Sequence, residues 1–207
     1  MKKTFWIVLF AASLGVPLAL YLSVAASGFD GYTLAIIAAI TAYILICDQI
    51  IVATRPAGLV NAFGAKFVSK LHATLPIAIL TLAVLHPILK EANGFSEETA
   101  QARIGIASLI LLATLMVFTV LFMANTVWMR IKPLARLKKW VTLRLGLTYP
   151  VARVVHGLFA LIAIAIAIHA LLASTSDFSV NPVGAIWLMG MTGLSIVLYI
   201  RYRIKRR

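Results

Sequence analysis

Long apolar runs alternate with short polar breaks along this chain. Runs of about 20 apolar residues, the length that spans a bilayer as a helix, occupy roughly residues 5–26, 32–53, 67–89, 104–129, 150–173 and 180–200. The breaks carry turn-forming and polar residues, as in "SGFDG", "TRPAGLVNAFG", "KEANGFSEETAQAR" and "STSDFSVNP". Because backbone groups in lipid must be hydrogen-bonded within each span, the pattern predicts an all-α membrane protein, a bundle of six transmembrane helices.

Composition supports the same class and bounds the chemistry. The 207 residues are 62% hydrophobic and only 12% charged, whereas a soluble domain is about a quarter charged. A single cysteine excludes an internal disulfide and a cysteine-cluster metal site. None of the breaks is long enough for a second folded domain, so we expect residues 1–207 to form one domain.

Charge predicts the orientation of this bundle. If the N-terminus is cytoplasmic, 17 of the 19 basic residues lie in inner segments, and only Lys90 and Arg103 lie outside. This is a strong positive-inside bias, and it predicts a multi-pass protein of the cell's inner or plasma membrane with both termini cytoplasmic. The bias also accounts for the net charge of +13, so the bilayer is the expected partner and nucleic acid is not needed.

The N-terminus has an alternative interpretation. The segment "MKKTFWIVLFAASLGVPLALYLSVAASG" has the basic start, apolar run and small-residue end of a secretory signal. Its apolar run is about 20 residues, longer than the 7–15 of a signal core. We therefore expect a retained first helix, and cleavage would leave five spans with every histidine in place.

All four histidines lie in two of the spans. His72 and His86 belong to "LHATLPIAILTLAVLHPIL", and His156 and His169 belong to "VHGLFALIAIAIAIHALL". Histidines in spans are rare and usually mark function. A separation of 14 residues is about 21 Å along a helix and returns to within about 40° of the same face. The 13-residue separation is about 19.5 Å but rotates by about 220°, so it requires local tightening of the helix or binding sites offset around it.

The spacing predicts two levels, each with one imidazole from each helix. His72 and His156 lie near the inner boundary, and His86 and His169 near the outer one. No carboxylate or thiol lies nearby in the sequence. Zinc needs three or four protein ligands, and copper redox sites usually include a thiolate or thioether. Two facing imidazoles instead suit the axial positions of a haem iron, and such ligation favours electron transfer.

On these two stretches the chain resembles the ferric reductase-like transmembrane domain, the haem-binding domain of ferric reductases, NADPH oxidases and the haem subunit of the methionine sulfoxide reductase system. That family has six helices with histidine pairs in the third and fifth, spaced 13 or 14 residues apart. The resemblance implies two haems b, an inner one held by His72 and His156 and an outer one held by His86 and His169.

The resemblance also suggests residues for the haem propionates, with departures from the family pattern. Family members often carry a basic residue directly after the first histidine of a pair, where this chain has alanine and glycine. Lys70 and Arg153, just upstream of His72 and His156, could take that role for the inner haem. Lys90 or Arg103 could do so for the outer haem.

The expected function is electron transfer across the membrane. The 207 residues contain no glycine-rich dinucleotide fingerprint, so we expect electrons to come from a separate cytoplasmic flavoprotein or similar donor. The acceptor could be ferric iron, oxygen, a flavin or an outer-side partner protein. Two alternatives stay open: a quinol-linked cytochrome b subunit of a larger dehydrogenase, and a haem-free histidine-based metal or proton transporter.

Two further segments carry predictions. The break "RIKPLARLKKWVTLRLG" is basic with interleaved apolar residues, which is typical of an amphipathic segment on anionic lipid. A docking site for an acidic reductase is the alternative. Asp48, near the inner end of residues 32–53, is expected to pair with a nearby base such as Arg55.

Overall fold

Six helices of membrane-spanning length make up most of this protein. The computed structural model describes residues 3–25, 28–95, 98–123 and 131–205. The helices long and apolar enough to cross a membrane are α1 (Lys3–Ala25), α2 (Gly31–Ala53), α4 (Ala65–Ala92), α5 (Ala100–Met123), α8 (Tyr149–His156) together with α9 (Phe159–Leu171), and α10 (Pro182–Lys205). The described residues contain no strand. The predicted six-helix membrane protein is therefore confirmed, and the last part of the 104–129 prediction lies outside the described residues.

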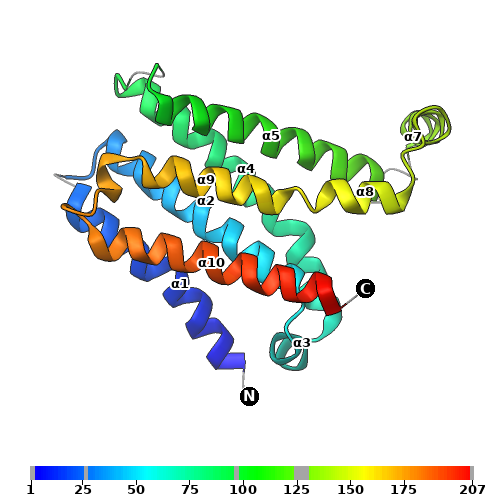
Figure 1. The fold of residues 1–207 in the computed structure, drawn as a ribbon, viewed down its shortest axis with the longest axis horizontal. Coiled ribbons are helices and arrows are strands. Elements are labelled where there is room, and N and C mark those ends of the chain that lie inside the picture. The colour runs from blue at the N-terminus through cyan, green and yellow to red at the C-terminus, as the bar shows by residue number, and fades with distance from the viewer. Residues whose placement is uncertain (1–2, 26–27, 96–97, 124–130, 206–207) are drawn as a thin grey trace.

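Helix α2 is the centre of the bundle. Fourteen of its 23 residues are buried, against two in α4 and three in α5. It contacts α1, α4, α9 and α10, and Figure 1 shows it with α9 between α5 on one side and α1 and α10 on the other, while α4 crosses behind α9. At its start, the Asp30 carboxylate accepts a hydrogen bond from the Thr33 backbone N–H at 2.8 Å. That bond holds the pKa of Asp30 below its ordinary value.

The outer helices expose apolar side chains that suit contact with lipid. Large exposed hydrophobic residues occur on every peripheral span, among them Ile7, Ile77, Ile110, Leu161 and Ile186. A soluble protein rarely exposes such a continuous apolar surface. The exposed surface and the central α2 together fit a bundle whose outside solvent is hydrocarbon.

Between the spans, the described residues form two short α-helices, both seen nearly end-on where the spans are seen from the side (Figure 1), and one 3-10 turn, η1 (Ser174–Ser176). Helix α3 (Ala57–Phe63) lies in a break that we expected to be irregular. Pro56 precedes it and Gly64, with φ of 87°, follows it, so the residues that indicated a turn delimit a helix. The expected amphipathic segment contains α7 (Lys132–Leu145), which is followed by Gly146 in the left-handed conformation.

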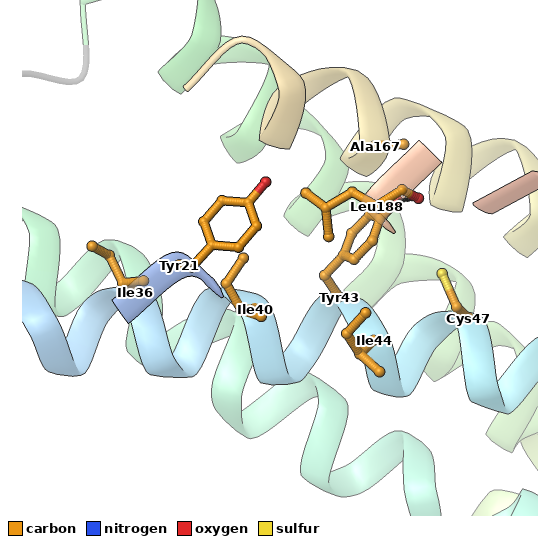
Figure 2. Close-up of a cluster of buried hydrophobic side chains, with 8 residues drawn as sticks. All are labelled: Tyr21, Ile36, Ile40, Tyr43, Ile44, Cys47, Ala167 and Leu188. Atoms are coloured by element: carbon orange, nitrogen blue, oxygen red, sulfur yellow. Dashed lines mark hydrogen bonds between the residues drawn. The ribbon is translucent and has the colours of Figure 1, made fainter. Parts of the chain in front are cut away.

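One buried hydrophobic cluster of the bundle joins α1, α2, α9 and α10 (Figure 2). Tyr21, Ile40, Tyr43 and Leu188 are among its eight buried residues. Both tyrosine hydroxyls are satisfied inside the bundle: that of Tyr43 donates to the Leu188 carbonyl at 3.0 Å, and that of Tyr21 lies 2.7 Å from the Ser176 hydroxyl. These contacts fix the spans that lie next to the histidine helices.

Asp48 does not pair with Arg55, contrary to the sequence-based expectation. Its Oδ2 accepts a hydrogen bond from the Ser13 hydroxyl of α1 at 3.0 Å, and its side chain is buried. Arg55 lies beyond the end of α2 and donates to the Ser69 hydroxyl at 3.1 Å. Seven residues separate the two in the sequence, and the helix end directs the arginine toward α4 instead.

Candidate functional site

The structure brings the four histidines together as two pairs. His72 of α4 and His156 of α8, here named pair A, have ring centres 6.1 Å apart with planes at 85°. His86 of α4 and His169 of α9, named pair B, have ring centres 6.2 Å apart with planes at 71°. The grouping of the rings is the one that the spacing predicted, with one imidazole from each span at each of two levels.

The joint between α8 and α9 explains how a 13-residue spacing serves both levels. Around Gly157 the helix tightens: four backbone donors within five residues bond to carbonyls three residues back rather than four, at Gly157, Leu158, Ala160 and Leu161. Each residue wound this way adds about 20° of rotation. Four of them bring the expected rotation of about 220° to about 300°, within about 60° of alignment. The sequence analysis expected either local tightening of the helix or binding sites offset around it, and the structure shows local tightening.

In pair B, backbone carbonyls hold both rings. The Nδ1 atom of His86 lies 3.0 Å from the Ala35 carbonyl oxygen, and that of His169 lies 2.8 Å from the Gln101 carbonyl oxygen. A carbonyl only accepts, so both Nδ1 atoms carry a proton and donate it. In the neutral imidazole this leaves the lone pair on Nε2, which is the tautomer that binds a metal through Nε2.

In pair A, side chains hold the rings instead. The Nδ1 atom of His156 lies 3.1 Å from the Thr119 hydroxyl of α5, which can accept or donate. The Nδ1 atom of His72 lies 2.9 Å from Nε2 of Gln49, which can only donate. All the hydrogen bonds that the described residues make to the four rings go to Nδ1.

A glycine and a cavity make room at pair B. A Cβ atom on Gly105 of α5 would lie 2.6 Å from Cε1 of His169, so only glycine lets the ring rest against this helix. A cavity of about 350 Å³ adjoins the pair, and both His86 and His169 line it. Its volume lies within the range of about 300–1,000 Å³ that is typical of ligand and cofactor sites.

The basic residues considered for an anionic ligand have different positions. Lys90, one helical turn after His86, lines the cavity and lies 3.4 Å from the ring centre of Phe95. Arg103 is exposed on α5 and does not line the cavity. Lys70 and Arg153 are exposed on α4 and α8, two and three residues before the histidines of pair A. Of the four, only Lys90 lines the cavity, and the binding of a haem propionate by any of them stays a prediction.

The donor set fits haem iron better than a metal ion held by protein alone. An imidazole binds a metal at about 2 Å, and its ring centre is about 1.1 Å from the nitrogen, so two rings on opposite sides of one ion have centres about 6.2–6.4 Å apart. Both observed separations lie close to this. Among the described residues, no group of three histidine, cysteine or acidic side chains is gathered as for a metal ion.

Sequence reasoning missed the side chains that hold pair A and the glycine behind pair B. Gln49 and Thr119 are polar residues within apolar spans, and that exception was the available signal. Their partners are 23 and 37 residues away in the chain, so the pairing needed the fold. Gly105 gave no signal, because glycine is common in transmembrane helices.

Comparisons of this chain with protein-family models, curated proteins and solved structures find no match. The resemblance to the ferric reductase-like transmembrane domain therefore stays a prediction. It rests on the histidine spacing and the six-span pattern.

Proposed function

We propose that this chain is a di-haem b membrane cytochrome that transfers electrons across the membrane, as an electron-transport component of an oxidoreductase. The observation that carries the proposal is the pair of imidazole pairs, with ring centres 6.1 and 6.2 Å apart. In each pair the Nδ1 atoms are occupied by neighbouring spans, so Nε2 is the nitrogen left for iron. A haem held by two histidines would have no position left for a substrate at its iron, and such a haem would serve electron transfer.

The residues of the chain would hold and orient the cofactors. His72 and His156 would ligate one haem iron, and His86 and His169 the other. Haem supplies reversible one-electron oxidation and reduction of its iron. The carbonyls of Ala35 and Gln101 keep pair B in the tautomer for ligation, and Lys90 would neutralise an anionic group in the adjoining cavity.

The direction of transfer follows from the proposed topology. With the basic segments inside, pair A lies at the cytoplasmic level and pair B at the outer level. The electron donor would then be a cytoplasmic flavoprotein or a comparable reductant, and the acceptor an outer-side compound or protein. With a separate donor protein, this chain itself would not need residues that accept hydride from a nicotinamide cofactor.

A histidine-based transporter is the competing function, and one observation favours it. Glu91 lines the same cavity as His86 and Lys90, and a relay of protons or metal ions uses acidic groups beside histidines. A haem-dependent test separates the two functions, because a relay needs no haem.

Electron transfer across proteoliposomes tests the proposal. Vesicles with trapped ferricyanide and the haem-loaded protein receive dithionite outside, and the loss of ferricyanide absorbance is followed. We expect rapid bleaching with the wild type and a rate near that of protein-free vesicles for His86→Ala and His72→Ala. The exposed Thr81→Val on α4 serves as control and should match the wild type. Equal bleaching by wild type and both histidine variants would contradict the proposal.

A further inference from the structure

Pro76 removes a backbone hydrogen bond of α4 at His72. In an α-helix the N–H of residue 76 would donate to the carbonyl of residue 72. Proline has no N–H, so the His72 carbonyl loses its partner within the helix. The carbonyl that is freed belongs to the predicted iron ligand itself.

Gln49 occupies the freed carbonyl. It comes from α2, the most buried span, and its Nε2 donates to the His72 carbonyl oxygen at 2.7 Å. The same nitrogen lies 2.9 Å from Nδ1 of the His72 ring. One amide thus contacts both the backbone and the ring of His72, which fixes the side-chain conformation of the ligand.

The oxygen of the same amide is left over. Gln49 Oε1 is buried without a hydrogen-bond partner among the described residues. A buried acceptor without a partner costs about 1–3 kcal/mol, and such atoms call for an explanation. The atom is bonded to the same carbon as the nitrogen that contacts Nδ1, so a tilt of the amide that leaves Nε2 at the His72 carbonyl can bring Oε1 toward the ring.

Iron ligation supplies the missing donor. A neutral imidazole that binds a metal through Nε2 carries its proton on Nδ1 and needs an acceptor there. In pair B backbone carbonyls already fill this role, whereas Nδ1 of His72 faces an amide nitrogen. His72 is therefore the ligand whose surroundings must change when iron binds.

Resting on the proposed function, we infer that Gln49 is the positioning residue of the haem at pair A. Its amide keeps Nε2 on the His72 carbonyl that Pro76 frees and turns Oε1 to accept the Nδ1 proton of the ligated ring. Gln49 then hydrogen-bonds both the backbone carbonyl and Nδ1 of His72, and its buried oxygen gains a hydrogen-bond partner only in the haem-bound state. Pair B does not depend on this residue.

Two variants of Gln49 separate the acceptor from mere packing. Gln49→Leu removes both polar atoms, and loss of such a partner lowers metal affinity about 10- to 100-fold. We expect this variant to keep one haem per chain when free haem is removed by an excess of a haem-binding protein. Gln49→Glu keeps an acceptor for Nδ1 but loses the donor to the His72 carbonyl, so it should hold the second haem more firmly than Gln49→Leu does. It should also lower one of the two reduction potentials, because a stronger acceptor makes the imidazole more electron-rich.

The measurements are the haem-to-protein ratio and a redox titration of the full-length protein in detergent. The haem at pair B reports that each variant is folded, and Thr81→Val is the control with two haems and unchanged potentials. Gln49→Leu with two haems at wild-type potentials would overturn the inference, and so would Gln49→Glu losing the same haem as readily as Gln49→Leu does. A wild-type protein without haem would instead contradict the proposed function.

Discussion

Single residues decide how closely the histidine rings approach the neighbouring spans. Four imidazoles could be found from the sequence because histidine in an apolar span is costly and conspicuous. Their partners could not, because two are backbone carbonyls of Ala35 and Gln101, which every residue type provides. The geometry that leaves Nε2 free for the proposed ligation is therefore a property of the fold and not of the residue pattern.

A side chain at residue 105 should displace the His169 ring. The Cβ of Gly105→Ala would lie 2.6 Å from His169 Cε1, so the ring must move away from α5 and from the Gln101 carbonyl. We expect haem affinity at pair B to fall about 10-fold or more, as when a metal-binding histidine loses its hydrogen-bond partner. Haem affinity at pair A should stay unchanged. The haem-to-protein ratio during haem extraction measures this.

The matched control is Gly193→Ala on α10, where an added Cβ meets no atom within 4 Å. It should keep the wild-type ratio throughout the extraction. If Gly105→Ala held both haems as firmly as Gly193→Ala does, the ring contact would have no bearing on haem binding.

At the scale of the element, the joint between α8 and α9 sets the two levels in register. The sequence indicated that a 13-residue spacing needs an adjustment, and the structure places it at Gly157. The sequence did not show what packs against the adjustment: the Tyr199 hydroxyl of α10 approaches Gly157 so closely that a Cβ there would be 2.8 Å from it.

Gly157→Ala should disturb the joint. The new methyl group would meet both the Tyr199 hydroxyl and the Val154 carbonyl oxygen, and overpacking of this kind costs about 1–3 kcal/mol. We expect a lower thermal unfolding midpoint and weaker haem retention at pair A, which adjoins the joint. Adding Tyr199→Phe removes the nearer of the two contacts and should restore part of the midpoint. A double variant no more stable than Gly157→Ala would show that the hydroxyl contact is not the cause.

Helix α7 has the exposed basic and apolar residues expected of a helix on an anionic membrane surface. Its exposed Lys132, Arg136 and Lys139 are three and four residues apart and so share one face, while Leu137 and Trp140 are exposed apolar residues on the same helix. Each basic residue near an anionic membrane contributes about 1 kcal/mol of binding. Hydrogen exchange of α7 in nanodiscs should be slower with anionic than with neutral lipid.

Changing all three basic residues to glutamine should remove that difference between lipids. Equal exchange of wild-type α7 in both lipids would rule out the lipid interpretation and favour the alternative, a docking surface for an acidic donor protein.

At the scale of the whole molecule, the six spans were predictable because hydrocarbon imposes a length and a composition on every helix that crosses it. The prediction of 32–53 agrees with α2 (Gly31–Ala53) within a residue at its start. Helix α3 was missed because Pro56 and Gly64 indicate a turn equally well. The central place of α2 could not be predicted either, since all six spans are similarly apolar and only packing distinguishes them.

If the two histidine pairs hold two haems, the haems can be counted in the purified protein. The wild-type protein, expressed with sufficient haem and purified in detergent, is measured by the pyridine haemochrome assay against the protein concentration from amino-acid analysis. We expect two haems b per chain and the sharp absorption bands of low-spin, bis-histidine iron. A protein that shows no haem absorption even after haem is supplied would contradict this expectation, and a ratio of one would leave one of the two pairs without its proposed ligand.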